Sequence, residues 1–188
     1  EMCIRDSVTT VLFNDQYKML YNRRELKDVS KMTDKDYTPG GMTALLDAVG
    51  RTIHKMDMVS GIHRKDKGNK VLFVIITDGE ENDSKEYTYA DVKKLIKDRQ
   101  ENAGWEFIFL GANIDAAAAA ENLGIDRDRA VKYKNTGSGV RANFKAVAEL
   151  SDSLAKSGRV SDEWKETVEK DEDDAADKQS AAVISHRR

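Results

Sequence analysis

The first stretch of hydrophobic positions predicts two short strands. Val8 to Asp15 reads VTTVLFND, which is rich in β-branched and aromatic residues and ends on an Asn-Asp pair that favours a tight turn. Tyr17 to Tyr21 follows directly, so we expect the two segments to form an antiparallel hairpin. The charged continuation from Asn22 to Lys27 is typical of a strand at the edge of a sheet. From Asp28 to Thr38 the chain is polar, and we expect a loop.

Beyond this loop the apolar positions change to the spacing of a helix. After Pro39, Gly40 and Gly41, apolar residues recur every three or four positions, which predicts a helix that begins near Thr43. The next apolar segment, Val71 to Thr77, is a continuous and largely β-branched run. Such a run is typical of a strand with helices on both faces, so we expect this strand to be central in a parallel sheet.

The second half of the chain alternates helices with strands. We expect helices over residues 88–99, 116–123 and 140–154, and strands over residues 105–110 and 130–133. Capping residues mark the helix boundaries: Thr88 with Asp91 as a capping box, Asp115, Gly124 and Gly158. The alternation predicts an α/β fold with a doubly wound, mostly parallel, Rossmann-like sheet and the hairpin at its antiparallel edge. In such sheets ligands bind beyond the carboxyl ends of the strands, which here are loops 40–43, 78–84 and 111–115.

Length and composition favour one domain with less ordered ends. At 188 residues, of which 39% are hydrophobic, the chain can bury a single core. Beyond Gly158 the composition becomes acidic and small-sided, as in EKDEDDAADKQSAA, so we expect residues 159–188 to form a disordered tail. The first seven residues, EMCIRDS, look non-native or disordered. We therefore place the domain at residues 8–158.

Charge and apolar run length exclude two classes of partner. Charged residues make up 35% of the chain with both signs interspersed, and the net charge of −3 provides no basic surface for nucleic acid. The longest apolar run is far shorter than the roughly 20 residues that cross a bilayer. The single cysteine, Cys3, forms no internal disulfide and fits a reducing compartment. We expect a soluble, cytoplasmic protein that binds neither nucleic acid nor membrane.

Two residues at the predicted ligand edge could hold a metal ion. Asp78 follows the apolar strand in TDGEEN, where a buried carboxylate would need a partner such as a hard divalent cation. Thr43 adds a hydroxyl at the start of the preceding helix, in GGMTALLDA. The alternative is purely structural: Thr43 would cap its helix and Asp78 the following turn. Spacing alone does not choose between the two.

Three segments, PGGMTALLDAVG, VLFVIITDGEEN and WEFIFLGANID, resemble von Willebrand factor A-type domains in their order and spacing. The resemblance covers roughly Val8 to Leu154 and is closest to small stand-alone bacterial and phage-type members. It implies a site for Mg²⁺ or Mn²⁺ that binds a protein partner through an acidic side chain of that partner. In this family the ligands are a DxSxS motif, a later threonine and an aspartate, so the resemblance assigns Thr43 and Asp78. We expect Gly41, Gly79 and Asn113 at the periphery of this site.

The chain departs from this family in one respect, because it contains no DxSxS motif. In the family this motif follows a first strand that lies in the middle of the sheet, between the strands predicted at Val8 to Phe13 and Val71 to Thr77. We therefore expect a truncated domain without its central first strand, in which those two strands have unpaired edges. With two ligands remaining, metal binding should be weak or absent.

Other candidate residues favour structural roles. The three histidines lie far apart, NTGSG at 135–139 reads as a loop and cap, and the adjacent Glu80 and Glu81 are expected to be solvated. Asn113 and Asp115 are expected to cap a helix. We find no catalytic set and predict a binding module and no enzymatic activity. Two alternatives stay open: a metal-independent assembly domain, and a Rossmann-like metal-dependent hydrolase that uses Asp78.

Overall fold

A computed structural model describes residues 6–33, 35–36, 40–60, 70–160 and 163–169. These residues divide into two compact units, which are described separately. The first unit comprises residues 1–60 and 81–92, and the second comprises residues 61–80 and 93–188. Residues 1–5 and 170–188, which hold most of the predicted amino terminus and part of the predicted tail, lie outside the described residues. Within the described part of the chain, no helix is both long and apolar enough to cross a membrane.

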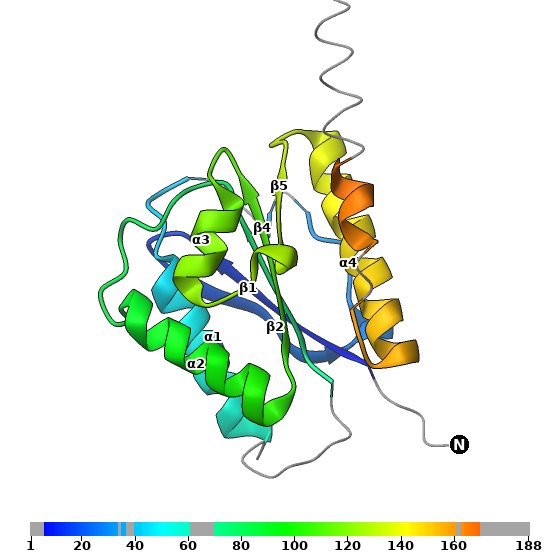
Figure 1. Ribbon diagram of the computed structural model, residues 1–188, viewed down its shortest axis with the longest axis horizontal. Coiled ribbons are helices and arrows are strands. Elements are labelled where there is room, and N and C mark those ends of the chain that lie inside the picture. The colour runs from blue at the N-terminus through cyan, green and yellow to red at the C-terminus, as the bar shows by residue number, and fades with distance from the viewer. Residues whose placement is uncertain (1–5, 34, 37–39, 61–69, 161–162, 170–188) are drawn as a thin grey trace, which may run out of the picture. The chain divides into compact units, whose positions relative to one another are not determined.

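The first unit begins with the predicted antiparallel hairpin (Figure 1). Strand β1 spans Ser7–Phe13 and β2 spans Tyr17–Glu25, so both are longer than the apolar pattern indicated. Arg23, in the charged continuation, has φ of 50°, and its N–H donates to the Thr9 hydroxyl at 3.1 Å. This irregularity shifts the register but lets the strands stay paired as far as Ser7 and Glu25. A single 3-10 turn, η1 (Leu26–Asp28), follows.

Helix α1 (Leu45–Ser60) supplies the buried face of the first unit. Leu45, Leu46, Val49 and Ile53 recur at helical spacing and are all nearly inaccessible to solvent. The Ala44 carbonyl accepts from the Ala48 N–H, so the helix begins just after the predicted start at Thr43. The long apolar spacing therefore predicted the helix, and its buried face, correctly.

Gly50 lies on α1 where the ring of Tyr87 packs against the helix. A Cβ at Gly50 would come within 2.5 Å of the Tyr87 ring. We expect Gly50→Ala to lower the free energy of unfolding by about 1–3 kcal/mol, because overpacking outweighs the gain in helix propensity. Urea unfolding would measure the change. In a background that carries Tyr87→Leu, Gly50→Ala should lower the free energy of unfolding by less than it does in the wild type. An equal loss in both backgrounds would contradict this packing.

The second unit contains a parallel sheet of three strands in the order β3-β4-β5. Their bounds are β3 Leu72–Thr77, β4 Glu106–Ala112 and β5 Ala130–Tyr133. The α/β class is thus confirmed, but the hairpin and these strands form two separate sheets and not one mixed sheet. β3 was predicted to be central, yet among the described strands it pairs only with β4, and it is β4 that lies in the middle. Both strands are continuous apolar runs, so composition could not decide which one has two neighbours.

The helices begin and end close to the predicted capping residues. Helix α2 spans Tyr89–Ala103, α3 spans Ala116–Leu123, a 3-10 turn η2 spans Arg127–Arg129, and α4 spans Gly137–Ser157. Thr88 and Asp91 form the reciprocal bonds of a capping box. Asp115 accepts from the Ala118 N–H, and Gly124 and Gly158 end their helices with positive φ. These caps were predictable because each depends on residues within four positions.

The ordered second unit extends beyond the predicted boundary at residue 158. Val160, Trp164 and Val168 are 6%, 2% and 1% exposed and belong to one core cluster with residues of β4, β5 and α4. Residues 164–169 are helical. The prediction of a disordered tail from residue 159 is therefore wrong for this part. The average composition concealed three apolar residues spaced four apart, which is one stripe of a helix. At the other end Ser7, predicted to be disordered, is paired in β1.

Candidate functional site

In the second unit, Asp78 lies directly beyond the carboxyl end of β3. Its side chain is exposed, and Oδ2 accepts a 3.2 Å hydrogen bond from Nδ2 of Asn135, in the loop after β5. Because the side chain is exposed, desolvation does not by itself require a cation here, contrary to what its place after an apolar strand indicated. Polar residues from two strand ends do meet at this edge, as expected for parallel strands.

Asp78 does not cap the turn that follows it. The hydroxyl of Thr77 takes that role, since it accepts from the Gly79 N–H at 3.3 Å and donates to the Gly79 carbonyl at 2.9 Å. The structural alternative proposed for Asp78 is thus contradicted. Its bond to Asn135 uses one carboxylate oxygen, and the other oxygen forms no hydrogen bond or ion pair with the described residues.

Next to β4, Asn113 has a left-handed backbone with φ of 58° and an exposed side chain. It does not cap α3, because Asp115 does. Asn113 borders a surface depression of about 750 Å³. The charged residues around this depression are Glu80, Asp115, Lys132 and Glu169. Asparagine is one of the few non-glycine residues that adopt this conformation readily, so the turn after β4 fits its sequence.

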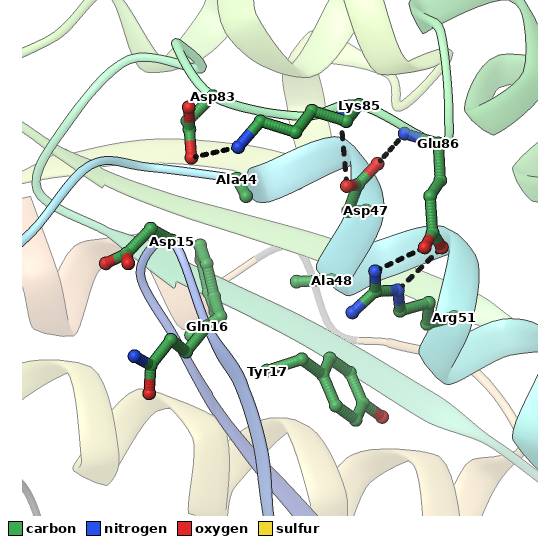
Figure 2. A pocket seen from close by; sticks show the side chains of 11 residues that line it. Asp15, Gln16, Tyr17, Ala44, Asp47, Ala48, Arg51, Asp83, Lys85 and Glu86 are labelled. Carbon is green, nitrogen blue, oxygen red and sulfur yellow. Dashed lines mark hydrogen bonds and ion pairs between the residues drawn. The ribbon is translucent and has the colours of Figure 1, made fainter.

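In the first unit, a smaller cavity of about 130 Å³ lies beside the first two turns of α1. Figure 2 shows the β1–β2 turn, with Asp15, Gln16 and Tyr17, on one side of it. On the other side are α1 and the loop that carries Asp83, Lys85 and Glu86. Sequence reasoning did not identify this cavity, because its walls come from three segments that are far apart in the chain.

Thr43 is fixed by its backbone and leaves its side chain free. Its N–H donates to Oδ1 of Asn82 at 2.7 Å, and its carbonyl accepts from the Asn82 N–H at 3.0 Å. Within the described residues the Thr43 hydroxyl has no hydrogen-bond partner, so Thr43 is not the N-cap of α1. That alternative for Thr43 is contradicted, and its oxygen remains available.

Glu81 and Ser84 cap α1 instead. Oε2 of Glu81 accepts from the Leu46 N–H at 2.9 Å, and Oγ of Ser84 accepts from the Asp47 N–H at 3.1 Å. Oε1 of Glu81 also accepts from the backbone N–H of Asp83 and of Ser84. The prediction that Glu80 and Glu81 are merely solvated is therefore wrong for Glu81, because its carboxylate serves as the cap of a distant helix.

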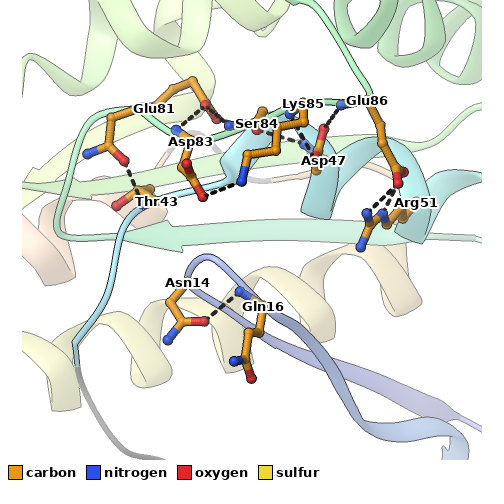
Figure 3. Close-up of polar contacts among 11 residues, drawn as sticks. Asn14, Gln16, Thr43, Asp47, Arg51, Glu81, Asp83, Ser84, Lys85 and Glu86 are labelled. Atoms are coloured by element: carbon orange, nitrogen blue, oxygen red, sulfur yellow. Dashed lines mark hydrogen bonds and ion pairs between the residues drawn. The ribbon is translucent and has the colours of Figure 1, made fainter.

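Asp47, in the first turn of α1, binds the loop over residues 81–87 at its far end. Its carboxylate accepts backbone hydrogen bonds from Lys85 at 3.0 Å and from Glu86 at 2.9 Å, as Figure 3 shows, and a third from Tyr87 at 2.9 Å. Burial raises the pKa of this carboxyl, but the three N–H donors together with nearby Arg51 outweigh it and leave the pKa below its usual value. One sequence signal could have identified it: Asp47 is a lone acidic residue in the apolar segment LLDAV.

At Gly41, which was assigned to the periphery of the metal site, the backbone conformation requires a glycine. It has φ of 93°, and a Cβ there would meet the Asp15 carboxylate at 2.5 Å. The neighbouring carbonyl of Gly40 accepts from Nδ2 of Asn14 at 2.9 Å. Gly41 therefore lets the loop before α1 pass close to the β1–β2 turn.

The two predicted metal ligands fit a hard cation in kind but not in number. Thr43 and Asp78 each offer an oxygen that bonds no other residue in the described part of the chain, and oxygen is the donor that Mg²⁺ and Mn²⁺ prefer. Thr43 belongs to the first unit and Asp78 to the second. Among the described residues no three His, Cys, Asp or Glu side chains are grouped so that they could hold a metal ion. These residues alone do not make a closed site.

Comparison of the chain with models of known protein families, with characterised proteins and with solved structures finds no match.

Proposed function

We propose that the chain is a protein-binding module of the von Willebrand factor A type, with no catalytic activity of its own. It would engage its partner at the carboxyl edge of the parallel sheet in the second unit. The observation that carries the proposal is Asp78, an exposed carboxylate at a strand end. One of its oxygens bonds no other described residue, and the other is oriented by Asn135. Open α/β sheets bind ligands at this edge.

The resemblance adds a divalent metal to this proposal. Asp78 would provide one ligand to Mg²⁺ or Mn²⁺, and an acidic side chain of the partner would complete the coordination. The resemblance assigns Thr43, which belongs to the first unit, as a further ligand. The role of the ion would be to join two carboxylates that otherwise repel each other. With so few protein ligands, we expect a Kd on the order of 1 mM or weaker for the ion alone.

Isothermal titration of Mg²⁺ and of Mn²⁺ into the full chain tests the metal. We expect weak binding that Asp78→Ala abolishes, because it removes the only charged ligand assigned to the ion. Asp128→Ala is the matched control, since Asp128 is an exposed carboxylate in η2 of the same unit. Equal binding by wild type and Asp78→Ala, or no binding by a folded wild type, would remove the metal from the proposal.

A metal-independent assembly domain is the second candidate. It is favoured by the hydrogen bond from Asn135, because Asp78 already has a partner within the protein and needs no ion to fix it. The two candidates differ in their response to chelation: partner binding that persists in EDTA and in Asp78→Ala supports assembly without metal. Loss of binding under both conditions supports the metal-dependent module.

A further inference from the structure

The cavity beside α1 in the first unit has an apolar floor and a charged rim. Its floor includes the small, buried side chains of Ala44 and Ala48, together with the rings of Phe13 and Tyr17. Its volume is about 130 Å³, and it is partly open to solvent. A cavity of this size admits one short aliphatic chain and excludes a nucleotide or a large cofactor.

The charges around the cavity favour a cation. Its lining includes four carboxylates but only two cationic side chains, Arg51 and Lys85. Arg51 is already occupied by a two-point ion pair with Glu86, at 2.6 and 2.8 Å. Asp15 differs from the other acids, because it makes no hydrogen bond or ion pair with any described residue. Among the described residues, the negative charge of Asp15 is therefore unpaired.

The position of the Lys85 side chain indicates that a primary ammonium fits the rim of the cavity. Its ammonium forms an ion pair with Asp83 (Figure 2), 3.5 Å from Oδ2, which is at the long end of ion-pair distances. The Lys85 side chain is 77% exposed. Such an exposed pair contributes little and exchanges readily with solvent. A primary ammonium of the chain itself thus rests loosely at the mouth of the cavity, where a ligand ammonium could replace it.

We propose that this cavity binds a primary alkylammonium group, with its aliphatic chain on the floor formed by Ala44, Ala48 and Phe13 and its charge between Asp15 and Asp83. The group could belong to a small free amine or to a lysine side chain of a protein partner. The Lys85 side chain moves aside when the ligand enters. This proposal does not depend on the metal or on Asp78.

Titration of the full chain, followed by amide NMR shifts at low ionic strength in an amine-free buffer, tests the proposal with three probes. N-acetyl-lysine methylamide and n-butylammonium carry the group, and N-acetyl-norleucine methylamide has the same carbon chain without the charge. We expect both ammonium probes to bind weakly, on the order of millimolar, and the norleucine probe not to bind. Tighter binding of the lysine probe identifies a protein partner, whereas equal or tighter binding of n-butylammonium identifies a free amine.

Two substitutions should change the affinity in opposite directions. Asp15→Asn should weaken ammonium binding by about two- to fivefold, and Lys85→Met, which removes the competing ammonium, should strengthen it by a similar factor. Asp28→Asn and Lys31→Met are the charge-matched controls, because both residues are exposed in the same unit and outside the cavity lining. Equal binding of the norleucine probe, absence of binding by either ammonium probe, or parallel effects of the two cavity variants would overturn the proposal. Asp78→Ala should leave this binding unchanged.

Discussion

Replacing Asp47 by alanine is expected to lower the free energy of unfolding by about 3–4 kcal/mol, as measured by urea denaturation. The substitution removes the acceptor of three backbone hydrogen bonds, from Lys85, Glu86 and Tyr87. Hydrogen bonds to a charged group contribute about 1.5–3 kcal/mol each and are not additive within one network. Asp47→Asn, which keeps one acceptor oxygen, should lose less. Asp28→Ala, an exposed aspartate of the same unit, should change stability by less than about 0.5 kcal/mol.

The stabilisation by Asp47 should also depend on pH. Its pKa is lower in the folded chain than its unfolded value near 3.9, so the ionised form is the one that folding favours. The contribution is complete above about pH 5 and decreases as the pH falls through the unfolded value towards the folded one. The stability difference between wild type and Asp47→Asn should therefore shrink below pH 4. A constant difference from pH 7 to pH 3 would show that the charge of Asp47 is not what stabilises the loop.

Gly139→Ala is expected to lower the free energy of unfolding by about 2–4 kcal/mol, through a collision within the second unit. A Cβ at Gly139 would overlap the backbone carbonyl oxygen of Lys134, and a backbone atom cannot move aside as the tip of a side chain can. The first turn of α4 would have to shift away from the loop after β5, which also carries Asn135. Urea unfolding followed by the fluorescence of Trp105 and Trp164, both buried in this unit, would measure the loss.

Gly137→Ala is the matched control, two residues away in the same turn. A Cβ there would have only Nη1 of Arg141 nearby, at 3.4 Å, and that side chain can move. We expect its stability to lie within about 0.5 kcal/mol of wild type, with a slight gain from the better helix propensity of alanine. If the two variants unfold at the same urea concentration, the tight contact at Lys134 is not a constraint on the fold.

Together these contacts explain how the loop after Glu80 is held in the first unit. Glu81 and Ser84 cap the first turn of α1, and Asp47 on that turn binds the backbone further along the loop. These hydrogen bonds fix the loop backbone, and with it the positions of Asp83 and Lys85 at the mouth of the cavity. The ammonium proposal depends on this fixed loop, so Asp47→Ala should weaken ammonium binding even though Asp47 makes no contact assigned to the ligand.

The sequence by itself determined the elements and most of their boundaries. The hairpin, the helical spacing of Leu45 to Ile53, and the caps at Asp115 and Gly124 all depend on residues close together in the chain, so local propensity and periodicity were sufficient. The α/β class followed from the alternation of these elements. The resemblance to von Willebrand factor A-type domains also came from the sequence and remains a proposal.

Only the tertiary structure decided which polar residues have structural roles. Glu81 caps a helix 35 residues away, Asp47 binds a loop about 40 residues away, and no local pattern records either partner. The order of the strands, the burial of Trp164 and the solvation of Asp78 were equally beyond the sequence. Each depends on which segments meet in space, and the free energy of such contacts is shared between residues that are distant in the chain.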